Sequence, residues 1–219
     1  MRLLDLEQGS PEWLAARAGV PTASCFSSIV TAGGKLSASA DGYAAELIDQ
    51  VARPMDERDQ DEQRAQFHGN RHTERGHDLE PKARDWFRFV TGLDVREAGF
   101  VLNDDGTLGC SPDSLIWHGG QPVAGVEIKA PEGKKHVLWM MQGKLPDEHK
   151  QQVHGSMVVT GLRQWHFVSH CPGYKPFRVL VERDAYTDTM GKLLGEFAER
   201  LATARTQFID YLPSYQKAA

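Results

Sequence analysis

Apolar residues recur at the three- and four-residue spacing of amphipathic helices in several parts of the chain. Many of these stretches begin at a capping residue or a proline and end at a glycine. Shorter segments are apolar throughout or alternate apolar and polar residues, which is typical of strands. This mixture predicts an α/β fold. Helices are predicted to begin near Ser10, Pro21, Asp41, Thr73, Val137, Pro146 and Ala185, and strands to cover 98–102, 164–169, 177–181 and both arms of a hairpin within 109–131.

The hairpin segment, residues 109–131, reads GCSPDSLIWHGGQPVAGVEIKAP. Its turn is predicted at HGGQ, residues 118–121, because consecutive glycines favour a tight reversal of the chain. On the second arm the sequence VEIK alternates, so Glu127 and Lys129 share one strand face and the apolar residues share the other. With the strand at 98–102, the two arms are predicted to form a three-stranded meander.

Asp113 lies on the first arm of this hairpin and Glu127 on the second. If the arms pair, the two carboxylates converge, and their repulsion must be offset by a cation or a proton. A hard divalent metal with oxygen ligands fits such a pair, and Lys129 could hold or deprotonate a water beside it. This pattern outlines a metal-dependent nuclease, although a Glu-x-Lys sequence alone is a weak signal.

Two short helices near the N-terminus could form an anion site. Ser10 and Pro11 are a typical helix start, and Arg17 would lie in the last turn of that helix. A second helix would begin near Ser24, with its N-terminal amides turned toward the first. Arg17, Ser24 and these amides could hold a phosphate, but two ordinary capped helices explain the local sequence equally well.

Charged residues elsewhere have simpler explanations. Glu80 borders the apolar face of its predicted helix, where a carboxylate usually pairs with a residue such as Arg84 one turn later. The segment 53–75 is strongly charged and is interpreted as solvated. Within it, His68 and His72 are four residues apart, but the intervening glycine and the missing acidic partner favour polar surface over a metal site.

Composition limits the remaining classes. The chain has 219 residues, 40% of them hydrophobic, and no linker or repeat, so residues 1–219 are predicted to form one domain. The three scattered cysteines form no CxxC pair, which argues against disulfides and structural zinc and favours a reducing cytoplasm. No membrane span or signal peptide is predicted. The net charge of −5 does not exclude DNA binding, since basic residues can be confined to one channel.

Several ordered motifs give nearly the whole chain a family resemblance: PEWLAARAGVPTAS, GHDLEPKARDWF, CSPDSLI, VEIKAP and QQVHGSM. Their order resembles the PD-(D/E)xK nuclease superfamily, and more closely the phage lambda exonuclease family, also known as the YqaJ or alkaline exonuclease type. The resemblance implies a restriction-endonuclease-like core, in which a central mixed β-sheet is flanked by α-helices.

The resemblance also implies roles for particular residues. One magnesium ion would be held by Asp113, Glu127 and the backbone carbonyl of Ile128, and a second by Asp113 and Glu80. Two such ions per site are expected, and Mn²⁺ is expected to substitute for Mg²⁺. The attacking water would be positioned by two further residues, Lys129 and Gln152.

The same resemblance assigns Arg17, Ser24 and Ser111 to the 5′-phosphate left on the DNA end after each cut. Trp13 matches a tryptophan that contacts DNA or packs within the first helix. The chain departs from the family where His154 replaces a glutamine. The loop that would supply strand-separating residues does not align, so those residues stay unassigned.

The function implied is a 5′-to-3′ exonuclease that digests one strand of linear double-stranded DNA to mononucleotides and leaves a 3′ overhang for recombination by strand annealing. The resemblance further implies a ring-shaped homotrimer and a single-strand annealing protein as partner, in the cytoplasm of a bacterium hosting a phage or prophage. The alternatives are a PD-(D/E)xK endonuclease and a non-catalytic DNA-binding module on the same fold.

Overall fold

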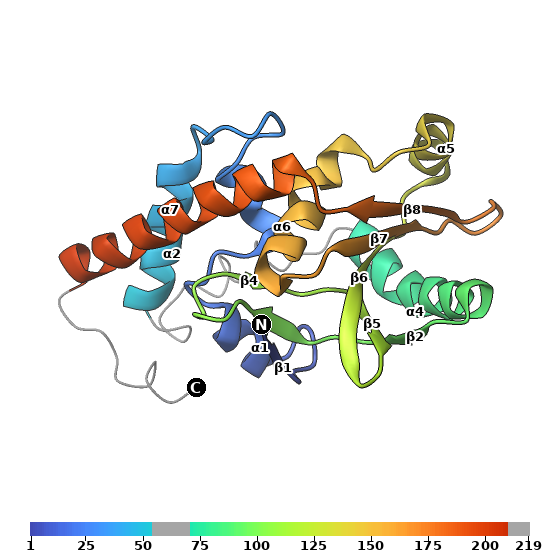
Figure 1. Cartoon of the computed structure of the whole chain (residues 1–219), viewed down its shortest axis with the longest axis horizontal. Helices are drawn as coiled ribbons and strands as arrows, with labels where there is room; N and C mark the ends of the chain where they lie inside the picture. Colours follow the sequence, from blue (N-terminus) through green and yellow to red (C-terminus); the bar gives the residue numbers. More distant parts are fainter. Residues whose placement is uncertain (54–70, 210–219) are drawn as a thin grey trace.

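Two β-sheets organise the chain in a computed structural model that describes residues 1–53 and 71–209, with backbone only for 71–77 (Figure 1). The smaller sheet has the order β1-β3-β4 and is antiparallel. The larger has the order β2-β5-β6-β7-β8 and is mixed, because β6 and β7 are parallel while the other pairs are antiparallel. The strands are β1 (Arg2–Leu4), β2 (Asp94–Arg96), β3 (Phe100–Leu102), β4 (Gly109–Cys110), β5 (Ser114–His118), β6 (Gln121–Lys129), β7 (Gln164–Ser169) and β8 (Phe177–Glu182).

Helices cover both faces of the larger sheet. On one face Phe87 packs with Val126 of β6, and on the other Met157 packs with Phe167 of β7. The long helix α7 lies beside α2 over a third cluster around Leu194 (Figure 1). The predicted mixed sheet flanked by helices is confirmed. The α-helices are α1 (Pro11–Arg17), α2 (Ala40–Ala52), α4 (Arg71–Thr91), α5 (Gly133–Gln142), α6 (Lys150–Thr160) and α7 (Ala185–Phe208), and the 3₁₀ helices are η1 (Ala23–Ser28) and η2 (Asp147–His149).

The predicted hairpin is confirmed as β5 and β6. His118 pairs with Gln121, and the two glycines between them have φ of 59° and 80°. Positive φ at both central residues is what a two-residue turn of this kind requires, and glycine supplies it without strain. The register places Ser114 opposite Val126, so Asp113 comes level with the strand end that carries Glu127.

The predicted meander is wrong, because the strand at 100–102 does not join this hairpin. Phe100–Leu102 pairs with Arg2–Leu4 and with β4, in the smaller sheet. The run 109–118 is therefore two strands, and the chain crosses from one sheet to the other at Ser111-Pro112-Asp113. Proline lacks the N–H that a continuous ladder needs, which is a physical reason for a break at this point.

Most predicted helix ends agree with the structure. Helix α7 begins at a capping box in which Asp184 and Thr187 bond reciprocally, while α5 begins four residues before Val137. The predicted helix at Pro146 is split into η2 and α6. His68, most of the charged stretch 53–75 and the side chains of His72 and Thr73 lie outside the described residues.

None of the helices in the described part of the chain combines the length and the apolar character needed to cross a membrane.

Candidate active site

Carboxylates and an amine meet where β6 ends and β5 begins. Asp113 accepts a hydrogen bond from the backbone N–H of Ile128 at 2.5 Å. Lys129 donates to Glu127 at 2.5 Å, and the side chains of these two residues are 28% and 2% exposed. Strand alternation puts Glu127 and Lys129 on one face of β6, as predicted. That face is covered by protein, since the register pairs Glu127 with the buried Phe167, a neighbour of α6.

Glu80 joins this group through a buried arginine. Arg84 donates to Glu80 at 2.5 Å, to the hydroxyl of Ser114 at 2.8 Å and to the carbonyl of Asp113 at 3.3 Å, and it also pairs with Glu97. The expected salt bridge between Glu80 and Arg84 is therefore confirmed. The same arginine binds the start of β5 to α4, so it also places Glu80 near the hairpin carboxylates.

Burial and repulsion by neighbouring carboxylates raise the pKa values of Glu127 and Glu80. The pKa of Glu127 rises to about 7, mainly through burial, with Asp113 adding to the rise and Lys129 opposing it. The pKa of Glu80 also rises to about 7, through burial and then Asp113. Burial would lower the pKa of Lys129, but Glu127 and Asp113 outweigh it and raise that pKa above its usual value. The site therefore holds excess negative charge in a confined space, which favours a bound cation.

Two of these carboxylates form ion pairs with protein cations, Glu80 with Arg84 and Glu127 with Lys129. Within residues 1–53 and 78–209, whose side chains the structure describes, no three acidic, histidine or cysteine side chains form a ready-made metal site. The chemistry of the donors nevertheless suits a hard divalent ion, because Asp113, Glu127 and Glu80 offer carboxylate oxygens. The N–H and C=O of a strand residue point to the same edge, so the Ile128 carbonyl faces the side on which Asp113 binds.

The structure places Gln152 half-buried in the first turn of α6, on the helix that packs over the Glu127 face. Its role in positioning water stays a prediction. His154 points elsewhere: its Nδ1 lies 2.7 Å from the hydroxyl of Thr187, and its ring packs edge-on against Tyr186. The residue that departs from the family pattern thus connects α6 to the start of α7.

Arg17, Trp13, Ser111 and Ser24, which the resemblance assigns to the 5′-phosphate or DNA, form a second cluster together with Thr22, and we call it the Arg17 cluster. Arg17 donates to the hydroxyl of Ser111 at 2.9 Å, and the indole N–H of Trp13 donates to the same oxygen at 3.2 Å. The guanidinium lies 4.2 Å from the centroid of the Trp13 ring. Thus Trp13 packs against the arginine and holds it in a fixed orientation.

Thr22 is a member of the Arg17 cluster that the sequence did not reveal. Its hydroxyl lies 3.4 Å from Arg17 and 3.2 Å from the exposed Ser24. The amides of the second helix contribute less than expected, because η1 is a short 3₁₀ helix and the N–H of Thr22 donates to the hydroxyl of Tyr43. The hydroxyl groups of Thr22, Ser24 and Ser111 beside the guanidinium are therefore groups available to an anion in addition to the remaining amides of η1.

The Arg17 cluster and the carboxylates are neighbours along the chain. Ser111 and Asp113 are separated only by Pro112, whose carbonyl accepts a hydrogen bond from Gln8 at 3.0 Å. Gln8 also donates to the carbonyl of Ala98 at 2.9 Å, so its side-chain amide ties the crossover between the sheets to the segment that precedes β3. This role of Gln8 was not predicted from the sequence, because its partners are 90 and 104 residues away.

The chain is similar to known proteins in both sequence and fold. The YqaJ-like viral recombinase domain family matches residues 12–163, which is more than half of the chain. The structure of LHK-Exo, an alkaline exonuclease from Laribacter hongkongensis, is similar with a TM-score of 0.72 and 28% identity over 90% of this chain and 95% of that one. LHK-Exo in complex with dAMP gives 0.67 and 27% over 90% and 97%.

A phage-related exonuclease from Haemophilus somnus 129PT shares the fold, with a TM-score of 0.54 and 13% identity over 84% of this chain and 96% of that one. No curated protein matches the chain.

Proposed function

Because the chain belongs to the family of YqaJ-like viral recombinase domains, we propose that it is a metal-dependent 5′-to-3′ exonuclease of linear double-stranded DNA. The family and the two LHK-Exo structures support a nuclease of the lambda exonuclease kind. In the proposed reaction the enzyme digests one strand to mononucleotides and leaves a 3′ single-stranded overhang for strand annealing.

The observation that carries the proposal is the adjacency of two chemistries at Ser111-Pro112-Asp113. The Arg17 cluster offers a guanidinium and hydroxyls to a terminal phosphate, and Asp113 begins the carboxylate group one residue beyond Pro112. A strand whose 5′-phosphate is bound by Arg17 would therefore bring its first phosphodiester to the carboxylates. This arrangement suits removal of nucleotides from a 5′ end.

Lys129 is proposed to act as a hydrogen-bond donor. Glu127 and Asp113 raise its pKa in the metal-free protein, which favours the protonated amine and hence its use as a donor. It can donate to the attacking water or to a phosphate oxygen while Glu127 fixes its position. Gln152 would hold the same water from the other side. Of the two roles considered for Lys129 from the sequence, holding water is thus the one that its charge state favours.

Magnesium would be held by Asp113, Glu127 and the Ile128 carbonyl, with Glu80 and Asp113 available to a second ion, and Mn²⁺ as a substitute. Such ions supply positive charge to the attacking and the leaving oxygen of an in-line displacement. Holding them requires Glu80 to exchange its ion pair with Arg84 for the ion, whereas Glu127 can keep Lys129 on one carboxylate oxygen and offer the other oxygen to the ion. The neighbouring carboxylates that help to raise both pKa values also favour a divalent cation, which competes with the proton for each carboxylate.

The proposal is tested on linear duplex DNA with a 5′-phosphate and a label on one strand. With magnesium, we expect release of labelled mononucleotides from the 5′ end and a growing 3′ overhang, and with EDTA no release. Release from the 3′ end alone would contradict the proposal. Closed circular DNA is the control for the endonuclease alternative, since efficient cutting of a circle needs no end.

Arg17→Ala is expected to reduce kcat/KM on 5′-phosphorylated ends by roughly 10- to 100-fold, because a charge-assisted contact with phosphate is lost. On 5′-hydroxyl ends the loss should be small. Arg96→Ala is the matched control, since Arg96 also lies over a tryptophan, 5.1 Å from the Trp117 ring, away from this cluster. Equal losses on both kinds of end would show that Arg17 does not recognise the phosphate.

The proposed partners and setting are a ring-shaped homotrimer and a single-strand annealing protein in the cytoplasm of a phage-bearing bacterium. A ring would concentrate basic residues in its channel and so let a chain of net charge −5 hold DNA. Light scattering coupled to size exclusion, with and without DNA, measures the assembly directly.

A further inference from the structure

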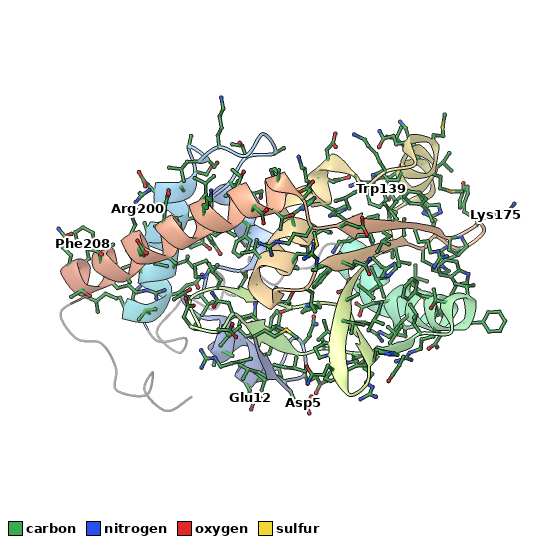
Figure 2. All side chains as sticks on the ribbon, in the orientation of Figure 1. Asp5, Glu12, Trp139, Lys175, Arg200 and Phe208 are labelled. Carbon is green, nitrogen blue, oxygen red and sulfur yellow. The ribbon has the colours of Figure 1, made fainter. Side chains whose placement is uncertain are left out.

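A groove of about 930 Å³ begins at Lys129 and continues along α5. The chain leaves β6 at Lys129, passes Pro131 and enters α5, which stands at one end of the molecule, away from α2 and α7 (Figure 1). The buried Trp139, on α5 (Figure 2), forms part of the groove wall. Tyr174, in the turn after β7, also lines the groove. The groove is therefore continuous with the proposed active site.

The helix that lines the groove is held firmly in place. His136 is fully buried; its Nε2 donates to the carbonyl of Lys175 at 3.0 Å, and its Nδ1 lies 2.7 Å from the hydroxyl of Ser169. These bonds join α5 to β7 and to the turn that bears Tyr174, so the two walls of the groove form one rigid unit.

Apolar side chains in this groove are unusually exposed. Leu138 is 51% exposed, Met141 81% and Tyr174 48%. Tyr174 lies against Gly133, where an added Cβ would come within 2.9 Å of the ring, so the glycine allows the ring to lie over the start of α5. Grouped exposed apolar side chains beside a site mark a binding surface more often than chance exposure does.

The groove and the Arg17 cluster lie on opposite sides of the carboxylates. In the larger sheet β5, β6, β7 and β8 are neighbours in that order. Ser111 of the Arg17 cluster lies three residues before β5, and α5 is bound to β7 and to the turn before β8. Glu127 and Lys129, at the end of β6, lie between them. A DNA strand that runs from the Arg17 cluster past the carboxylates would thus place its next nucleotide in the groove.

The charge of the groove also fits a nucleic acid strand. Lys129 lies at its inner end and the exposed Lys134 and Lys135 at its rim, against one acidic lining residue, Glu132. Lys135 is shared between Glu148, at 2.8 Å, and the face of the Trp139 ring. Aromatic and apolar surfaces stack bases while lysines contact phosphates, which is how proteins bind single strands without reading sequence.

We propose that the α5 groove binds the base of the second nucleotide, on the 3′ side of the phosphodiester that is cut, by stacking it against Tyr174. The inference rests on the proposed exonuclease function for the direction of the strand. It assigns the groove to DNA rather than to a protein partner, because the groove continues directly from Lys129.

The test compares an intact 5′-phosphorylated duplex with one that lacks the base of the second nucleotide. Loss of that base should lower kcat/KM for the first cut by about tenfold more in the wild type than in Tyr174→Ala, since only the wild type loses stacking. For each protein, kcat/KM on the intact duplex is divided by kcat/KM on the duplex without the base. Comparing this ratio between wild type and Tyr174→Ala cancels the effect of the missing base pair itself. Tyr174→Phe should behave as wild type, and so should Phe208→Ala, an exposed aromatic at the far end of α7 (Figure 2).

A binding experiment in EDTA separates this inference from the proposed function. With 2-aminopurine at the second nucleotide, wild-type protein should quench its fluorescence and Tyr174→Ala should quench it less, without any cleavage. Quenching that depends on Tyr174 in a protein that releases no nucleotides would refute only the exonuclease. The groove assignment would be overturned if wild type and Tyr174→Ala quenched 2-aminopurine equally and lost the same factor in kcat/KM on removal of the base. It would also be overturned if Tyr174→Ala affected only the binding of a protein partner.

Discussion

Lys129→Ala is expected to lower the rate of nucleotide release by about 10³-fold, within the range known for loss of a positioned proton donor. The side chain is held by Glu127 on the covered face of β6, so no neighbouring lysine can take its place at the same point. Affinity for DNA should change only a few-fold, because phosphate contacts elsewhere supply most of it. Single-turnover digestion and fluorescence anisotropy with calcium in place of magnesium measure the two quantities.

Two further variants make this result interpretable. Lys129→Arg keeps the charge but alters the geometry, so it should recover little activity. Lys192→Ala removes an exposed lysine of α7 and should leave both rate and affinity unchanged. Wild-type turnover in Lys129→Ala would remove this residue from the mechanism, whereas loss of DNA binding together with activity would indicate a role in affinity instead.

Glu127→Gln is expected to abolish nucleotide release and, without metal, to stabilise the fold. Glutamine keeps the shape of the side chain but removes the charge that a metal and Lys129 require. In the absence of metal the same charge is unfavourable, because burial and Asp113 raise the pKa of Glu127 to about 7. The melting temperature in EDTA at pH 8 should therefore be higher for the variant than for the wild type.

The direction in which the stability of the fold changes with pH follows from the raised pKa of Glu127. The carboxyl has a pKa near 4.5 in the unfolded chain and about 7 in the folded one. As the pH rises between these values, the unfolded state loses its proton first, so the wild type loses stability. The difference in melting temperature between variant and wild type should be near zero at pH 4 and grow up to about pH 7.

Magnesium should reverse this difference. Ion binding stabilises only the folded wild type, so its melting temperature should rise with magnesium concentration at pH 8, and that of Glu127→Gln should rise much less. Differential scanning fluorimetry across pH, with EDTA or magnesium, gives all of these values. A variant less stable than the wild type in EDTA at pH 8 would contradict the electrostatic argument, even if its activity were lost.

Local signals in the sequence predicted the parts of the fold that depend on local geometry. The turn between β5 and β6 follows from two glycines with positive φ, and the alternation of VEIK correctly places Glu127 and Lys129 on one strand face. The ends of α5 and α6 follow from Gly143 and Gly161, both left-handed. Such features need no information from distant parts of the chain.

The errors concern contacts between distant segments. Nothing near Phe100 reveals that it pairs with Leu4 rather than with the hairpin, and nothing near Arg17 reveals a hydrogen bond to a serine 94 residues away. The grouping of Arg17, Ser24 and Ser111 therefore came only from the family resemblance. Thr22 had no such help, because a threonine before a short helix is an ordinary cap.

The crossover at Ser111-Pro112-Asp113 has a consequence for the size of the product. Two residues of extended chain span at most about 7 Å, and Gln8 prevents the crossover from stretching or shifting. In the proposed reaction, the distance between the bound 5′ end and the bond to be broken is thus set by this short segment of chain. The step length of the enzyme, one nucleotide at each cut, would then be set by the spacing of two side chains on a single rigid segment.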